Sequence, residues 1–147
     1  MFSKVAIIVE WDNARLSEID RARDMLRALS EQAQEVARTT NATFDLMLLF
    51  DPEEVPQEIP TQVLGECVDQ AKWPGKISLT EVHGLTYYDQ KNFGVKQTDA
   101  DVILFVDSDV IPEEGWLGYL MDAMKDPSVQ VVGGETYLAT DSFIDRV

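Results

Sequence analysis

The sequence has 147 residues, the length of about one ordinary domain, and 45% of them are apolar, which is enough for a hydrophobic core and argues against a disordered chain. No apolar run approaches the roughly 18 residues that a membrane-spanning helix requires, so we expect no membrane span in this chain. The 27 acidic residues outnumber the 12 basic ones and give a formal net charge of -15 at pH 7; such a surface repels nucleic acid and anionic membranes, and we expect no nucleic-acid partner.

The first part of the chain predicts two strands with a helix between them. Residues 4–9 contain a continuous apolar run, VAIIV, which is typical of a strand covered on both faces and which we interpret as a first strand rather than as part of a signal peptide. A capping-box pattern at residues 17–20 opens an amphipathic pattern that extends to Val36 and predicts a helix. Residues 44–50, FDLMLLF, predict a second buried strand, which Asp51-Pro52 ends.

The rest of the chain continues this alternation. The patterns predict, in order, a helix over 61–71, a strand over 77–82, a helix over 86–97, a buried strand over 102–106, a helix over 112–124 with Pro112 near its first turn, and a fifth strand over 129–132. Strands that alternate with helices imply βαβ units. We therefore predict an α/β fold, with an open, largely parallel sheet and helices on both faces, in a single domain over residues 1–147.

Acidic residues follow three of the predicted strands. Glu10 and Asp12 come after the first strand, Asp51 after the second, and Asp107 and Asp109 after the strand at 102–106. In an open parallel sheet the carboxyl ends of the strands share one edge, and ligands bind beyond that edge. We therefore expect these acidic residues to converge on one site.

Asp107 and Asp109 form an Asp-x-Asp pair directly after an apolar strand. Residues two apart in an extended segment point to the same side, so both carboxylates can face one point if the strand continues that far. Two carboxylates suit a hard cation such as Mg²⁺ or Mn²⁺. Such a cation would relieve the repulsion between the carboxylates and would let an acidic protein hold a diphosphate, because no glycine-rich phosphate loop is present.

The segment YYDQKNFGVKQTDADVILFVDSDVIPEEGWLGYLMDAM, residues 87–124, resembles the core segment of the family 2 inverting glycosyltransferases, which have the GT-A fold. The elements that carry the resemblance are Lys91-Asn92-Phe93-Gly94, the apolar strand, Asp107-Ser108-Asp109, Pro112, and Trp116-Leu117 on the following helix. The similarity is specific over residues 87–134 and loose over most of the remaining chain. It implies a glycosyltransferase whose donor is a nucleotide-diphosphate sugar.

The resemblance also implies roles for individual residues. Asp109 would take a Mn²⁺ or Mg²⁺ ion bound to the diphosphate, and Asp107 would contact the ribose or share the metal. Asp51 stands where family members read the nucleobase. Glu10 and Trp11 lie in the first-strand loop that packs against the base, where Trp11 would stack on the ring, and Lys91 would reach the nucleotide.

The family resemblance implies a longer protein than these 147 residues. Family members place their catalytic base after a pair of central glycines, which Gly133-Gly134 match here, in the half that binds the acceptor. We therefore expect the base C-terminal to Val147. We therefore expect this chain to be the donor-binding part of a longer protein, or a divergent minimal relative, and to be inactive alone. Asp141 and Asp145 are more readily explained as acids at a helix N-terminus than as bases. The acceptor, whether glycan, lipid or protein, is not indicated.

Other functions remain open at this level. A non-catalytic nucleotide-binding or assembly domain of the same fold would explain why the segments after the first two strands, Glu10-Trp11-Asp12-Asn13 and Phe50-Asp51-Pro52-Glu53, differ from those usual in the family. A phosphohydrolase of the haloacid dehalogenase type also has a strand followed by Asp-x-Asp, but normally on its first strand, and a response-regulator receiver would need a lysine-bearing fifth strand.

His83, the one histidine, is most simply a loop residue. The single cysteine, Cys67, excludes an internal disulfide and fits a reducing compartment, so we expect a cytoplasmic location.

Overall fold

The computed structural model describes residues 2–12 and 19–137, and within them it contains a four-stranded parallel sheet and four helices. The strands are β1 (Lys4–Glu10), β2 (Thr43–Phe50), β3 (Ile77–Glu81) and β4 (Val102–Asp107), in the spatial order β3-β2-β1-β4. All three pairings are parallel, so the four carboxyl ends lie at one edge. The predicted α/β fold with an open parallel sheet is therefore confirmed.

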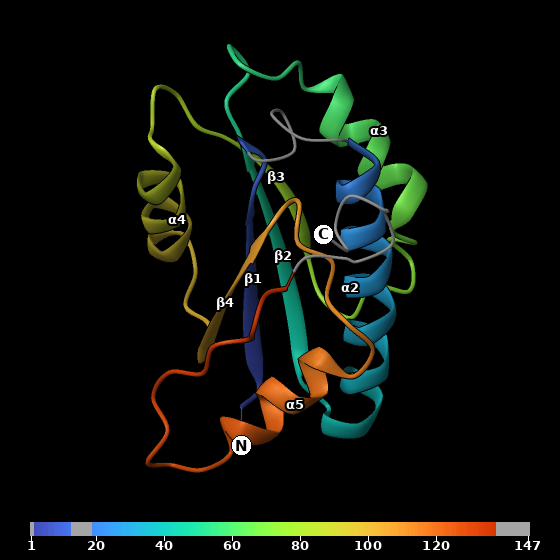
Figure 1. Ribbon diagram of the computed structural model, residues 1–147, viewed down its shortest axis with the longest axis vertical. Helices are drawn as coiled ribbons and strands as arrows, with labels where there is room; N and C mark the ends of the chain where they lie inside the picture. Colours follow the sequence, from blue (N-terminus) through green and yellow to red (C-terminus); the bar gives the residue numbers. More distant parts are fainter. Residues whose placement is uncertain (1, 13–18, 138–147) are drawn as a thin grey trace, which may run out of the picture.

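Helices cover both faces of the sheet, as predicted (Figure 1). Helix α4 (Tyr87–Lys96) lies on one face, and α2 (Ile19–Thr40), α3 (Glu58–Cys67) and α5 (Trp116–Ala123) lie on the other. The main core fills the space between the sheet and the face with α2, and it takes Val5, Ile7 and Val9 from β1. A smaller core around Ile8, Leu49 and Val82 lies beneath α4. The central strand is thus buried on both sides, which is why its sequence is continuously apolar.

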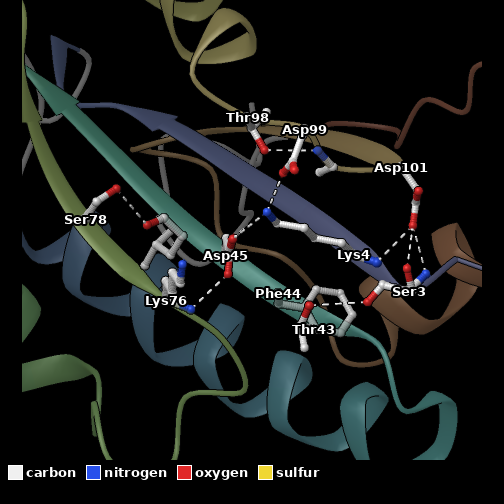
Figure 2. Close-up of polar contacts among 12 residues, drawn as sticks. Ser3, Lys4, Thr43, Phe44, Asp45, Lys76, Ser78, Thr98, Asp99 and Asp101 are labelled. Carbon is white, nitrogen blue, oxygen red and sulfur yellow. Dashed lines mark hydrogen bonds and ion pairs between the residues drawn. The ribbon is translucent and has the colours of Figure 1, made fainter.

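Hydrogen bonds and ion pairs connect the strands at the opposite edge of the sheet, where the strands begin (Figure 2). The Asp101 carboxylate accepts hydrogen bonds from the backbone N–H and the hydroxyl of Ser3, at 3.0 and 2.9 Å, and from the backbone N–H of Lys4 at 3.1 Å. The Lys4 ammonium lies 2.5 Å from Asp99 and 3.6 Å from Asp45. These contacts join β1, β2 and the turn before β4. The acidic residues of this edge are therefore engaged in holding the strands together.

The structure differs from the sequence prediction near the C-terminal end of the described chain. Residues 129–137 form no strand, so the predicted fifth strand over 129–132 is wrong for the described part of the chain. The backbone N–H of Val129 donates to Asp126 in a turn, and Val131 is exposed. So short an apolar run, Val131-Val132, does not form a strand without a neighbouring strand to share hydrogen bonds with it.

Two predicted helices have different limits in the structure. The helix predicted over 112–124 begins at Trp116, because Gly115 has a left-handed φ of 80° that a right-handed helix cannot include. The helix predicted over 61–71 is α3, Glu58–Cys67, which ends because Val68 is extended. The capping box predicted at residues 17–20 lies partly outside the described residues.

Strand β4 is an edge strand among the described residues, which the sequence did not predict. Its only pairing is with β1, and α4 packs mainly over β1 and β2. Phe105, on the same face as α4, is therefore 46% exposed although its strand is apolar. The apolar run predicted a buried strand, and for Phe105 that prediction is wrong.

Candidate functional site

The carboxyl edge of the sheet brings three of the expected acidic residues into one region. Glu10 and Asp107 are the last residues of β1 and β4 and are direct neighbours in the parallel register. Ile8 and Ile103 belong to the small core beneath α4, so the alternation of side chains directs Glu10 and Asp107 to this same face. Asp51 follows the last residue of β2, on the other side of β1. Glu10 and Asp51 are buried, and Asp107 is partly exposed.

Helix α4 adds a lysine and a tyrosine to this edge. Thr86 caps the helix by accepting a hydrogen bond from the backbone N–H of Asp89, so the helix begins at Tyr87 and places Tyr87 and Lys91 one turn apart on one side. The Lys91 ammonium donates to Asp107 Oδ1 at 2.6 Å and to the Tyr87 hydroxyl at 2.5 Å, and that hydroxyl donates to the same Asp107 oxygen at 2.5 Å. We call Tyr87, Lys91 and Asp107 the α4–β4 triad.

Burial and hydrogen bonds fix the protonation of Lys91 and Tyr87. The side chain of Lys91 is 15% exposed and that of Asp107 is 36% exposed. Burial acts to lower the pKa of Lys91, but its hydrogen bonds with Asp107 and Tyr87 outweigh this and raise the pKa. Burial, and then the hydrogen bond to Asp107, raise the pKa of Tyr87. Lys91 is therefore charged and Tyr87 is a neutral donor at physiological pH.

Two aromatic rings surround the Lys91 ammonium. It lies 4.1 Å from the centroid of the Tyr87 ring and 5.9 Å from that of Phe105. Both distances are within the range in which a cation is attracted to a ring face. The ammonium is thus held by a carboxylate, a hydroxyl and two rings.

Asp51 is held by backbone groups. The residue is 6% exposed, and its carboxylate accepts from the N–H of Glu53 at 3.0 Å and from the N–H of Gly84 at 2.8 Å. These two hydrogen bonds, with Gly84 the larger contributor, lower the pKa of Asp51 although burial opposes them. Asp51 therefore joins the loop after β2 to the loop after β3. His83, beside Gly84, is exposed, in agreement with the interpretation of a loop histidine.

Trp11 lies in the main core rather than at the open edge. Its side chain is 1% exposed, and its backbone N–H donates to Leu49 O at 2.8 Å. By strand alternation it faces the side of the sheet opposite to Glu10. In this structure the ring offers no free face on which a nucleobase could stack.

Asp109 lies beyond the end of β4. The strand ends at Asp107, and a turn follows in which the backbone N–H of Val110 donates to Asp107 O at 3.1 Å. The extended geometry on which the sequence argument depended therefore does not reach Asp109. Among the described residues, no group of three or more His, Cys, Asp or Glu side chains is arranged to hold a metal ion.

The oxygens that remain still fit a metal ion shared with a substrate. Asp107 Oδ1 accepts the two hydrogen bonds that Lys91 and Tyr87 donate to it, and within the described chain no hydrogen bond is directed at Asp107 Oδ2 or the Asp109 carboxylate. Mg²⁺ is commonly held by one or two carboxylates together with phosphate oxygens of the substrate. Asp107 and Asp109 thus match the protein's share of such a shell.

Sequence reasoning missed two residues of this region. Tyr87 belongs to the triad, and its spacing of four residues before Lys91 in a predicted helix was the available signal. Gln90 lies on the buried side of α4; its amide donates to Leu85 O at 3.3 Å, while its own Oε1 accepts no hydrogen bond in the described structure. Nothing in the sequence indicated Gln90.

The fold and the acidic carboxyl edge define an α/β protein of the class that binds ligands beyond the ends of parallel strands. Residues 62–146 match the family model described as Glycosyl transferase family 2, which is more than half of the chain, and the chain belongs to this family. The resemblance found in the sequence is thereby confirmed.

A solved structure has a fold similar to that of this chain. The crystal structure of S. aureus TarS 1-349 is similar with a TM-score of 0.59 and 19% sequence identity, over 84% of this chain and 32% of that one. At this identity the likeness concerns the fold alone, and this chain spans about a third of that chain. No curated protein matches the sequence. In the part of the chain that the structure describes, no helix is long and apolar enough to cross a membrane.

Proposed function

We propose that this glycosyltransferase family 2 domain binds a nucleotide-diphosphate sugar at the carboxyl edge of its sheet, for metal-dependent transfer of the sugar to an acceptor that is a glycan, a lipid or a protein. The observation that carries the proposal is the convergence of Glu10, Asp51, Asp107 and Lys91 on that edge in a chain of this family. Ligands of open parallel sheets bind at this place.

The surroundings of each residue suit a different part of the donor. Asp51 is buried and ionised, with lone pairs left to accept from a nucleobase N–H. Lys91 forms an ion pair with Asp107 and suits the diphosphate. Asp107 would contact the ribose or share a metal with Asp109. Glu10 lies between the other two acids, as the neighbour of Asp107 in the register.

Mn²⁺ or Mg²⁺ is the cofactor that the family and the donor set indicate. Asp109 would hold it, with Asp107 as a second ligand. When bound, such an ion neutralises charge on the diphosphate and stabilises it as the leaving group. A protein with a net charge of -15 has particular need of this local positive charge.

The experiment is a calorimetric titration of UDP, GDP and their sugars at several Mn²⁺ concentrations. We expect binding of nucleotide and metal to reinforce each other, because the diphosphate completes the coordination shell of the ion. Asp109→Asn should remove this coupling, and Asp107→Asn should weaken it less if its main partner is the ribose. Asp122→Asn, which removes the same charge from an exposed position on α5, is the matched control.

The outcomes separate the parts of the proposal. Equal nucleotide affinity with and without Mn²⁺ in the wild-type protein would contradict the metal site. No affinity for any nucleotide or nucleotide sugar would contradict donor binding altogether.

A non-catalytic binding or assembly domain is the second candidate. It is favoured by the buried ring of Trp11, which has no free face for a nucleobase. In either case we propose that residues 1–147 alone transfer no sugar at a useful rate, because the catalytic base lies in a further part of the protein. The proposal is supported by the comparison with TarS, since this chain spans only 32% of the matched TarS chain. Transfer to added acceptors by these residues would contradict this.

The cytoplasmic location stays a prediction.

A further inference from the structure

The α4–β4 triad gives Asp107 a cation of its own before any ligand is present. The Lys91 ammonium lies 2.6 Å from Asp107 Oδ1, and the Tyr87 hydroxyl donates to the same oxygen. A divalent ion that used Asp107 and Asp109 together would lie a few ångströms from this ammonium. The two cations would repel each other, and the repulsion is stronger in partly buried surroundings than in bulk water.

The aromatic rings add further contacts that hold the Lys91 ammonium beside Asp107. Tyr87 and Phe105 flank the ammonium at 4.1 and 5.9 Å, and the Lys91 side chain is 15% exposed. Withdrawal of Lys91 from Asp107 would therefore lose a short charge-assisted hydrogen bond and ring contacts together. A bare metal ion offers no compensation for this loss, whereas a diphosphate offers oxygens that both the ammonium and the metal can share.

We propose that Lys91 is a positioning residue that holds Asp107 in the empty site, excludes divalent cations from the Asp107–Asp109 pair, and releases Asp107 only when a diphosphate draws the ammonium to itself. The release step rests on the proposed function. The exclusion of bare cations does not, because it follows from the triad alone. Lys91 thus makes the binding of metal conditional on the donor.

The test is a titration of Mn²⁺ alone, followed by the electron paramagnetic resonance signal of the free ion, with no nucleotide in the sample. We expect Lys91→Met to bind Mn²⁺ about tenfold or more tightly than the wild-type protein, since a unit charge a few ångströms away changes affinity by this order. Lys96→Met is the matched control, because it removes the same charge from an exposed position on the same helix. It should leave Mn²⁺ binding close to that of the wild type.

Two further variants locate the effect. Lys91→Met combined with Asp107→Asn should lose the gained affinity, whereas Lys91→Arg, which keeps the charge, should not gain it. Lys91→Gln replaces Lys91→Met if that variant is unfolded by circular dichroism, and the same result is expected.

The proposal is overturned if the neutral Lys91 variant binds Mn²⁺ no better than the wild type. It is also overturned if Lys96→Met gains as much, which would show a general charge effect, or if Asp107→Asn leaves the gain intact. A failure of nucleotide binding in the earlier titration would leave the Mn²⁺ result unaffected, so the failures of the two proposals are distinguishable.

Discussion

Asp51 is an acidic residue of the carboxyl edge that backbone groups hold in place. Both of its oxygens accept backbone hydrogen bonds, from Glu53 and Gly84, and 6% of the residue is exposed. We predict that Asp51→Asn lowers the free energy of unfolding by about 1–3 kcal/mol. The amide NH₂ is a donor and would face one of the two backbone N–H groups, which would then have no acceptor. Urea denaturation near neutral pH measures this, with Asp122→Asn as the exposed control.

The pH dependence of the Asp51 effect has a fixed sign. The folded-state pKa of Asp51 lies below the ordinary value of 3.8, so its stabilising contribution is complete above that value and is lost as the pH falls through the lower folded pKa. The difference between the wild type and Asp51→Asn should therefore be constant near neutrality and shrink below about pH 4. A difference that grows on acidification would contradict the assignment of the ionised form.

At the scale of elements, the position of α4 decides the site. Gly94 allows the helix to approach β1 and β2 closely: a Cβ at this position would lie 2.9 Å from Ile8 Cγ2 and 3.2 Å from Leu49 Cδ1. The same approach brings Lys91, one turn earlier, to Asp107. The Lys-Asn-x-Gly segment therefore combines a packing residue with a charged residue on one short helix.

We predict that Gly94→Leu lowers the free energy of unfolding by about 1–3 kcal/mol, because its side chain has no space between α4 and the sheet. Gly65→Ala is the control, since Gly65 lies in α3 and a Cβ added there would have no other atom within 4 Å. The control should stabilise the protein by about 0.5–1 kcal/mol through helix propensity. Thermal and urea unfolding of both variants check the pair, and a neutral Gly94→Leu would show that α4 can shift outward freely.

At the scale of the whole molecule, the charge of -15 acts against compactness. Carboxylates are gathered at the carboxyl edge, and the opposite edge has its own group around Lys4 (Figure 2). We predict that the urea midpoint rises when NaCl is raised from about 0.01 M to about 0.15 M, because the Debye length shortens from roughly 30 Å to roughly 8 Å. KCl should act equally, as expected for screening. A midpoint that falls with salt would show that attractive surface ion pairs outweigh the repulsion.

Much of the fold was accessible from the sequence because it depends on local periodicity. The apolar runs at 4–9 and 44–50 predicted buried strands, and these are β1 and β2, the two inner strands of the sheet. The alternation of strands and helices then restricted the sheet to a parallel one, which placed the acidic strand ends at a common edge. The segment from Tyr87 to Met124 was also sufficient to indicate the family that the match over residues 62–146 confirms.

What the sequence by itself determined was therefore the order of the four strands and four helices of the described chain, though not the absence of a strand at 129–132, and the family they belong to. The tertiary structure alone decided which groups meet: it buried the ring of Trp11 in the core, left Phe105 exposed on an edge strand, and joined Lys91 to Asp107 across α4 and β4. The physical reason is that periodicity records only whether a side chain faces an apolar environment. Its particular partner is set by register and by the close approach of helix to sheet, which depend on residues far apart in the chain.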